Sequence, residues 1–183
     1  MKNLMIAVLA IFLTACSATG DTPQQQRAAI NDMNAKVLTD VESASPGAVA
    51  SAKSAAGYAT FSNAQINLIF VAAGGGYGVV TDNSSGATTY MDMYEGGLGL
   101  GLGAKDFRAL FVFHTQEALD RFVNEGWGFG GEADAAAKAG DKGGEVGGGV
   151  TIGDITVYQL TETGLAIQAT VKGTKYAKND ELN

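Results

Sequence analysis

Residues 96–103 read GGLGLGLG, and this stretch decides the fold class. In an extended strand, successive side chains point to opposite faces, so Leu98, Leu100 and Leu102 would share one face and glycines the other. A face of glycines carries no side chains, which lets another backbone, a helix or a ligand approach closely. We therefore predict an α+β fold, in which a glycine-rich antiparallel sheet curls into a sandwich or barrel, with N-terminal helices and one inserted helix.

The segments on either side of this stretch alternate between helix and strand patterns. Thr22-Pro23 and Ser45-Pro46 are typical helix starts, and Thr115 is a typical N-cap. Helices are predicted at 23–40, 46–57 and 116–124, and strands at 58–61, 66–71, 77–81, 88–93, 107–113, 155–161 and 165–171. Residues 133–139 are helical by propensity, although a loop or a flat strand also fits them. We find no internal repeat or domain boundary.

Composition narrows the classes of function. Glycine accounts for 26 of 183 residues, and 46% of the chain is hydrophobic, a share typical of globular proteins. Twelve basic and nineteen acidic residues give a net charge of -7, which argues against a nucleic-acid partner because phosphate contacts need a basic face. One cysteine and one histidine exclude an internal disulfide and a zinc site built from several such residues. No cofactor is expected.

The N-terminus has the pattern of an export signal. Residues 4–13, LMIAVLAIFL, are an apolar run too short to span a bilayer but typical of the core of a signal peptide. Leu13-Thr14-Ala15-Cys16 resembles the bacterial lipobox, which implies that residues 1–15 are removed and that Cys16 is acylated, for example with palmitate. By the same resemblance, Ser17 implies sorting to the outer membrane. The alternative is an ordinary signal peptide with an incidental cysteine.

These patterns together predict the organisation of the chain. Residues 1–15 would be the lipoprotein signal peptide, 16–22 a tether, 23–176 a single domain and 177–183 a polar tail. Loss of Lys2 would leave a mature net charge of -8. Two or more acyl chains anchor a protein stably. We therefore expect a lipid-anchored protein of the bacterial cell envelope, on the outer membrane and facing the periplasm.

The sequence contains no specific motif for nucleotide binding or for hydrolysis. The glycine runs lack the Gly-Lys-Ser/Thr of a P-loop, and no nucleophile elbow is present. His114 is interpreted as a strand-end residue, and Asp92 and Glu95 as surface acids, although His114 or this carboxylate pair could serve a hydrolase. Aromatic residues beside glycines could line an apolar groove, but core filling is the better interpretation. We predict no enzymatic activity and no catalytic residue.

Five segments follow one another in a recognisable order. They lie at 52–61, 74–80, 99–104, 110–122 and 157–166, and they are an "AKGLAIF"-like stretch, a glycine-rich strand, a glycine-leucine alternation, an apolar strand with an "EAL" helix, and the final strands. In this order they resemble the SYLF domain, a lipid-binding module. The match runs from Pro46 to Tyr176. It implies binding of acidic phospholipids, without catalysis, by a bacterial lipoprotein member of the family.

The negative charge of this chain changes which lipid the resemblance leads us to expect. The turn before the final strand is Thr161-Glu162-Thr163, acidic where the family is basic, and a negative protein repels anionic head groups. A neutral or apolar acyl ligand is therefore favoured over a phosphoinositide. The basic candidates for head-group contact are Arg27, Lys36 and Lys53, unless they form only a solvated helix face. The alternative function is an envelope interaction protein that recruits an unknown protein partner through its acidic surface.

Overall fold

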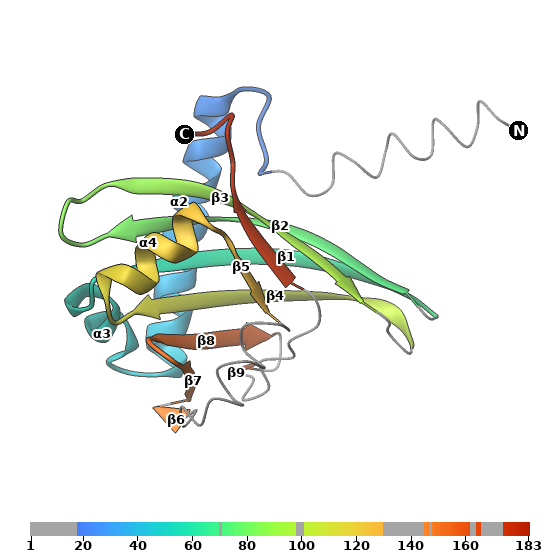
Figure 1. Cartoon of the computed structure of the whole chain (residues 1–183). Coiled ribbons are helices and arrows are strands. Elements are labelled where there is room, and N and C mark those ends of the chain that lie inside the picture. The colour runs from blue at the N-terminus through green and yellow to red at the C-terminus, as the bar shows by residue number, and fades with distance from the viewer. Residues whose placement is uncertain are drawn as a thin grey trace, which may run out of the picture.

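A computed structural model describes residues 18–69, 71–97, 101–129, 145–146, 148–161, 164–165 and 174–183 (Figure 1). Within these ranges, three helices accompany one antiparallel ten-stranded sheet, so the α+β fold is confirmed. The helices are α2 (Pro23–Ala44), α3 (Ala48–Ser54) and α4 (Gln116–Asn124). The strands are β1 (Gly57–Ile69), β2 (Val71–Asp82), β3 (Thr88–Gly97), β4 (Gly101–Phe113), β5 (Trp127–Phe129), β6 (Glu145–Val146), β7 (Gly149–Ile152), β8 (Ile155–Thr161), β9 (Gly164–Leu165) and β10 (Thr174–Lys178).

The sheet is strongly twisted and open. Its strand order is β5-β10-β3-β2-β1-β4-β8-β7-β6, with β9 beside β8. The strands at the two ends of this order, β5 and β6, are not paired with each other in the described residues. Figure 1 shows α2 and α3 behind the sheet and α4 in front of it, so that the central strands are covered on both faces. Within the described residues the sheet is not closed into a barrel, and its layers are compatible with the sandwich alternative of the predicted architecture.

The stretch at 96–103 does not form one strand as predicted. Its first two glycines end β3, residues 101–103 begin β4, and residues 98–100 lie outside the described ranges. Because β3 pairs with β2 while β4 pairs with β1, the stretch joins two strands on opposite sides of the β1–β2 hairpin. The spatial order β3-β2-β1-β4 is that of a Greek key. The fold class was therefore right, although the element assigned to this stretch was wrong.

A glycine stripe does occur, but on β2. Gly74, Gly76 and Gly78 are at alternate positions, so they share one face of the sheet. On this face Phe61 of β1 is paired with Gly78, and a Cβ at Gly78 would overlap the Phe61 ring. The stripe therefore lets large side chains of neighbouring strands lie across the backbone of β2.

Side chains of the central strands alternate between two cores. Leu110 and Val112 of β4 pack toward α2 and α3, whereas Phe111 and Phe113 pack toward α4. All four side chains have no exposed surface. This part of the strand predicted at 107–113 is therefore buried on both faces. The core on the α4 side is aromatic, and the ring of Phe61 lies 5.7 Å from that of Phe111 between centroids.

Local sequence explains how the helices begin and end. The Thr22 hydroxyl accepts a hydrogen bond from the amide of Gln25, and Pro23 occupies the first helical position of α2. Thr115 caps α4 in the same way, by accepting from the amide of Ala118, and α4 has the predicted bounds. Helix α2 runs to Ala44, a few residues further than the predicted length of about 18 residues, and its buried residues are Ile30, Val37 and Val41.

Three expectations about the strands and termini differ from the structure. The strand predicted at 58–61 and residues 66–69 of the strand predicted at 66–71 belong to one strand, β1, because the residues between them pair with β2 and β4, whereas Val71 begins β2. The polar tail predicted at 177–183 begins inside β10, which extends to Lys178, and its Leu182 is only 4% exposed. Ala18, inside the predicted tether, is 6% exposed and packs with Ile30. Residues 133–139 and 166–171 lie outside the described ranges.

Candidate functional site

A shallow groove of about 630 Å³ lies between α2 and α3 on the surface of the described domain. The apolar part of its lining comes from Leu38, Val49 and Ala50. The polar part comes from Thr39, Glu42, Ser43 and Lys53. The groove therefore combines an apolar strip with one carboxylate and one ammonium group, and its formal charge is zero.

The turn between the two helices shapes this groove. Gly47 has a φ of +92°, in the left-handed region that favours glycine, and precedes the first residue of α3. The Glu42 carboxylate accepts hydrogen bonds from the amides of Gly47 at 2.9 Å and Val49 at 3.0 Å. These two bonds lower the pKa of Glu42, and the nearby Lys53 ammonium lowers it further. Glu42 thus remains ionised and fixes the start of α3 against α2.

Small residues place α3 against the sheet. Ala48 and Ala52 are buried and pack with Tyr58 and Leu110. These small side chains allow this face of α3 to lie close to the sheet. Because this face of α3 is turned inward, Val49, Ala50 and Lys53 remain available for the groove.

The three predicted basic residues are not brought together. Lys53 lines the groove, whereas Arg27 donates its Nε proton to the carbonyl of Leu182 at 2.9 Å and lies over the Tyr90 ring at 6.0 Å. Lys36 is paired with Asp40 at 3.6 Å. Of the three, only Lys53 is placed to meet a ligand in this groove. Cys16 lies outside the described residues.

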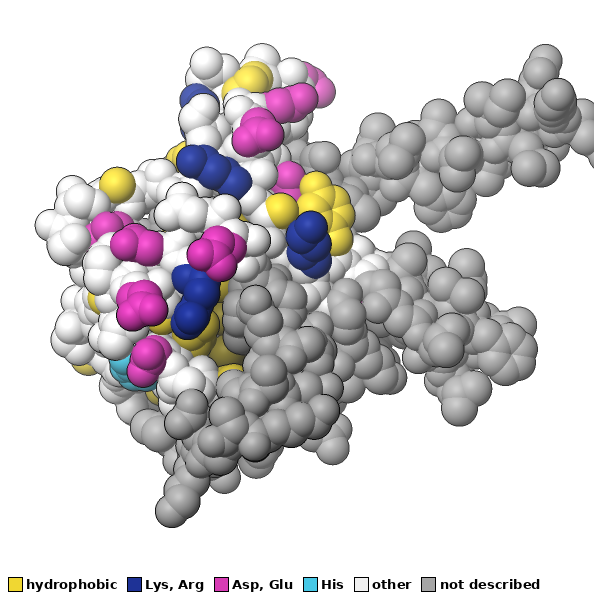
Figure 2. Space-filling view, viewed as in Figure 1, with side chains coloured by type: hydrophobic (Ala, Val, Ile, Leu, Met, Phe, Trp, Pro, Cys, Tyr) yellow, Lys and Arg dark blue, Asp and Glu magenta, His cyan; other side chains and the backbone are white. Residues whose placement is uncertain are grey.

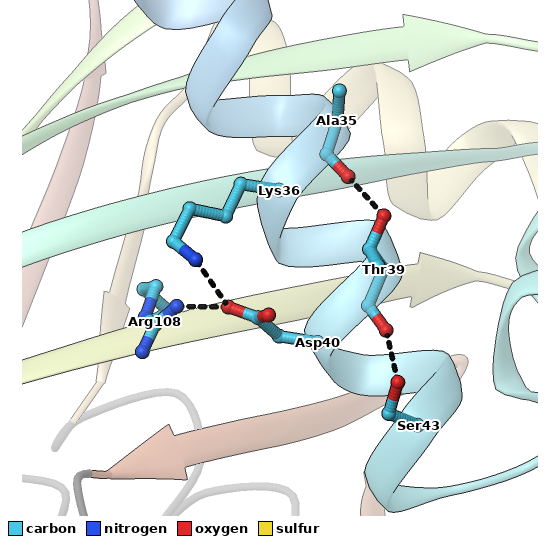
Figure 3. A network of polar contacts seen from close by, with 6 residues as sticks. All are labelled: Ala35, Lys36, Thr39, Asp40, Ser43 and Arg108. Carbon is cyan, nitrogen blue, oxygen red and sulfur yellow. Dashed lines mark hydrogen bonds and ion pairs between the residues drawn. The ribbon is translucent and has the colours of Figure 1, made fainter.

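Asp40 and Arg108 form a contact that we did not predict. The Arg108 guanidinium of β4 donates to the Asp40 carboxylate of α2, and Lys36 approaches the same carboxylate oxygen (Figure 3). The side chains of Asp40 and Arg108 are about one-third exposed, at 30% and 33%. The contact ties α2 to the sheet, on the other side of the helix from the groove residues Thr39 and Ser43 (Figure 3). Helical periodicity alone could only place Asp40 away from the apolar stripe.

The groups considered for catalysis do not converge. Asp92 and Glu95 are three residues apart on β3, so they lie on opposite faces of the sheet. Asp92 accepts from Asn179, whereas Glu95 accepts from Asn63. His114 directly follows β4, at the strand end as predicted, but it is exposed where partial burial was expected, and its Nε2 lies 2.7 Å from the Thr156 hydroxyl oxygen. Asp92, Glu95 and His114 are therefore not arranged as a nucleophile, a base and an orienting acid.

A second surface feature is acidic. Glu117, Asp120 and Glu125 on and after α4 are exposed, as is Asp154 in the β7–β8 turn. Figure 2 shows acidic side chains gathered on the face that carries α4, with basic ones among them. This face is separate from the groove, because α3 lies on the other side of the sheet (Figure 1).

The described part of the chain contains neither a membrane-spanning helix nor a metal-binding cluster. None of its helices is long and apolar enough to cross a bilayer. Nor do three or more His, Cys, Asp and Glu side chains within it gather in a way that would hold a metal ion.

Comparison with known proteins gives two matches. The model of the Ysc84 family, described as "Las17-binding protein actin regulator", matches residues 94–183, from β3 to the end of the sequence. A curated relative, "Beta cell expansion factor A" of Aeromonas veronii, is 30% identical over 164 residues, which are 88% of this chain. The chain spans 60% of the length of that relative. The sequence resemblance to the SYLF domain is thereby confirmed for residues 94–183, which match the model of the Ysc84, or SYLF-domain, family.

Proposed function

We propose that the protein is a non-enzymatic lipoprotein of the bacterial cell envelope, and that its α2–α3 groove binds a neutral phospholipid or another apolar ligand. The groove itself is the observation that carries this proposal, because it combines apolar lining residues with Glu42 and Lys53. A zwitterionic head group matches one carboxylate and one ammonium group. An anionic head group would meet a protein whose overall charge is -7.

The energetics favour a ligand with hydrocarbon. Each methylene moved from water to an apolar surface contributes about 0.8 kcal/mol. An open groove covers only part of an acyl chain, so the affinity per ligand is modest. A protein already held at a membrane meets its lipid at high effective concentration, which compensates for modest affinity.

The N-terminal anchor would place the domain close to the bilayer. The lipobox-like sequence makes Cys16 the proposed acylation site, and outer-membrane sorting follows from Ser17. Ala18 is already packed against the domain, so only Cys16 and Ser17 remain as a link. Two extended residues span about 7 Å. The expected tether is therefore short, and the N-terminal end of α2 lies near the membrane surface.

Vesicle flotation of the Cys16→Ser chain tests binding without the covalent anchor. Binding to neutral phosphatidylcholine vesicles is expected, together with at least a fivefold loss in Ala50→Trp, which fills the groove from an exposed position. Lys178→Gln, on β10, removes an exposed lysine away from the groove and serves as the charge control. Equal flotation of all three chains would place lipid binding elsewhere, and no flotation would refute the proposal.

A second function rests on the acidic face of α4. The family description names a Las17-binding actin regulator, which is a protein-binding role for that family. Exposed acids at 117, 120 and 125 could recruit a basic protein partner. Crosslinking in cells distinguishes the two functions. A stoichiometric partner that is lost when all three acids are replaced by their amides, with no lipid bound, would favour the interaction function.

A further inference from the structure

Most polar side chains of the α2–α3 groove are already engaged with the backbone. Each oxygen of the Glu42 carboxylate accepts one amide from the start of α3. The Thr39 hydroxyl donates to the carbonyl of Ala35 at 2.9 Å, and the Ser43 hydroxyl donates to the carbonyl of Thr39 at 2.9 Å (Figure 3). A hydroxyl has a single hydrogen to donate. These three side chains therefore leave no hydrogen-bond donor for a ligand in the groove.

The remaining charged side chain of the groove, Lys53, is available to a ligand. Among the residues that the structure describes, none forms a hydrogen bond or an ion pair with its ammonium group. Lys53 is exposed and lies in the last turn of α3, four residues after Val49 and three after Ala50, so it neighbours both on the surface of the helix. All three residues line the groove. The groove thus presents three N–H donors and a positive charge beside its apolar strip.

Glu42 limits which anions the groove accepts. Hydrogen bonds from the two amides are the main cause that lowers its pKa, and the Lys53 charge lowers it further, so the carboxylate stays ionised. A singly negative ligand, such as a fatty-acid anion, therefore meets a negative charge within the groove and a net charge of -7 on the whole protein. A zwitterionic phospholipid offers Lys53 a phosphate, while its own ammonium group offsets the phosphate charge.

We propose that Lys53 selects the ligand of this groove by donating hydrogen bonds to a phosphodiester, so that a zwitterionic phospholipid binds in preference to an uncharged acyl lipid or a fatty acid. This inference rests on the function proposed for the groove and narrows the class of its ligand. A phosphodiester carries one negative charge and only acceptor oxygens, which match the donors of an ammonium group. The hydroxyl of an uncharged acyl lipid lacks the electrostatic part of this contact.

Nuclear magnetic resonance of the Cys16→Ser chain tests this selection with three soluble probes. Octylphosphocholine, octanol and nonanoate each consist of an octyl chain and one polar group, and they are titrated separately while the backbone amides of Val49, Ala50 and Lys53 are observed. Saturable shifts with octylphosphocholine are expected, with about fivefold weaker binding of octanol and of nonanoate. Binding of octanol or nonanoate as tight as that of octylphosphocholine would overturn the selection but leave an apolar-ligand groove. No saturable shift with any probe would refute the groove function as well.

Variants assign the selection to Lys53. Lys53→Gln removes the charge, so about a fivefold loss of octylphosphocholine affinity is expected, with the octanol affinity unchanged. Lys53→Arg should restore the preference, because a guanidinium group also donates to phosphate. Lys178→Gln, which removes an exposed lysine on β10, is the charge-matched control and should bind both probes as the unaltered side chains do. Equal losses of both probes in Lys53→Gln would show that Lys53 supports the shape of the groove, and would overturn the selection.

Discussion

At the scale of single residues, the absence of a side chain at Gly78 determines how the core packs around it. It lies in the middle of β2, where the ring of Phe61 covers its backbone. The glycine thus permits a large aromatic residue on the next strand, and that residue contacts Tyr176 and Phe111 in turn. The sequence predicted that glycines would allow a close approach, but not which glycines, because the strand pairing is set by distant residues.

We predict that Gly78→Ala destabilises the domain by about 3 kcal/mol, because the added methyl group overlaps the Phe61 ring and forces the core to shift. Gly86→Ala is the control, since Gly86 has a φ of +72° but open space around it. It should cost only about 1 kcal/mol, the backbone strain of the left-handed region. Urea unfolding measures both. A smaller effect at Gly78 than at Gly86 would contradict the packing described for β2.

Asp82 gives a prediction about pH. Hydrogen bonds from the hydroxyl of Ser84 and the amide of Ser85 are the main causes that lower its pKa to about 2 from 3.8. Because the folded pKa is below the unfolded one, the stabilisation is present above about pH 4 and is lost as pH falls toward 2. Asp82→Ala should therefore flatten the pH dependence of the urea midpoint between pH 4 and 2. An unchanged slope in this window would show that Asp82 is not held by its turn.

Among the secondary-structure elements, turns and helices were predicted best from the sequence. Helix α4 and strand β8 have the bounds that the sequence predicts, because Thr115 and the turns that bound β8 are local signals. Strand β1 was less predictable, since polar residues interrupt its apolar pattern and only pairing with two neighbours makes it continuous. The α2–α3 groove depends on how two helices are set against the sheet, so the sequence pointed to Lys53 but not to the groove.

The contact between Asp40 and Arg108 holds α2 to β4. Both side chains are partly exposed, so solvent weakens the pair, and we expect a coupling free energy of about 1 kcal/mol in a double-mutant cycle of Asp40→Asn and Arg108→Gln. The coupling should fall at 1 M salt because the ions screen it. A coupling near zero at low salt would show that apolar packing alone holds α2 in place.

The whole molecule presents different chemistry on its two faces. The helices α2 and α3 carry a groove of zero formal charge, whereas the α4 side carries exposed acids. The Ysc84 family match covers β3 to the end of the sequence, and the groove lies before it, in α2 and α3. The proposed ligand site therefore belongs to the part of the chain that this match does not include. The ligand of the α2–α3 groove therefore has to be identified by experiments on this protein itself.

Lipid extraction from the purified Cys16→Ser chain, followed by mass spectrometry, tests the central claim most directly. Without the thiol at position 16, any lipid recovered is bound non-covalently. The account predicts a neutral phospholipid that co-purifies with the protein and is reduced at least fivefold in Ala50→Trp. A lipid-free protein, or an equal amount of lipid in both chains, would contradict a lipid site in the α2–α3 groove.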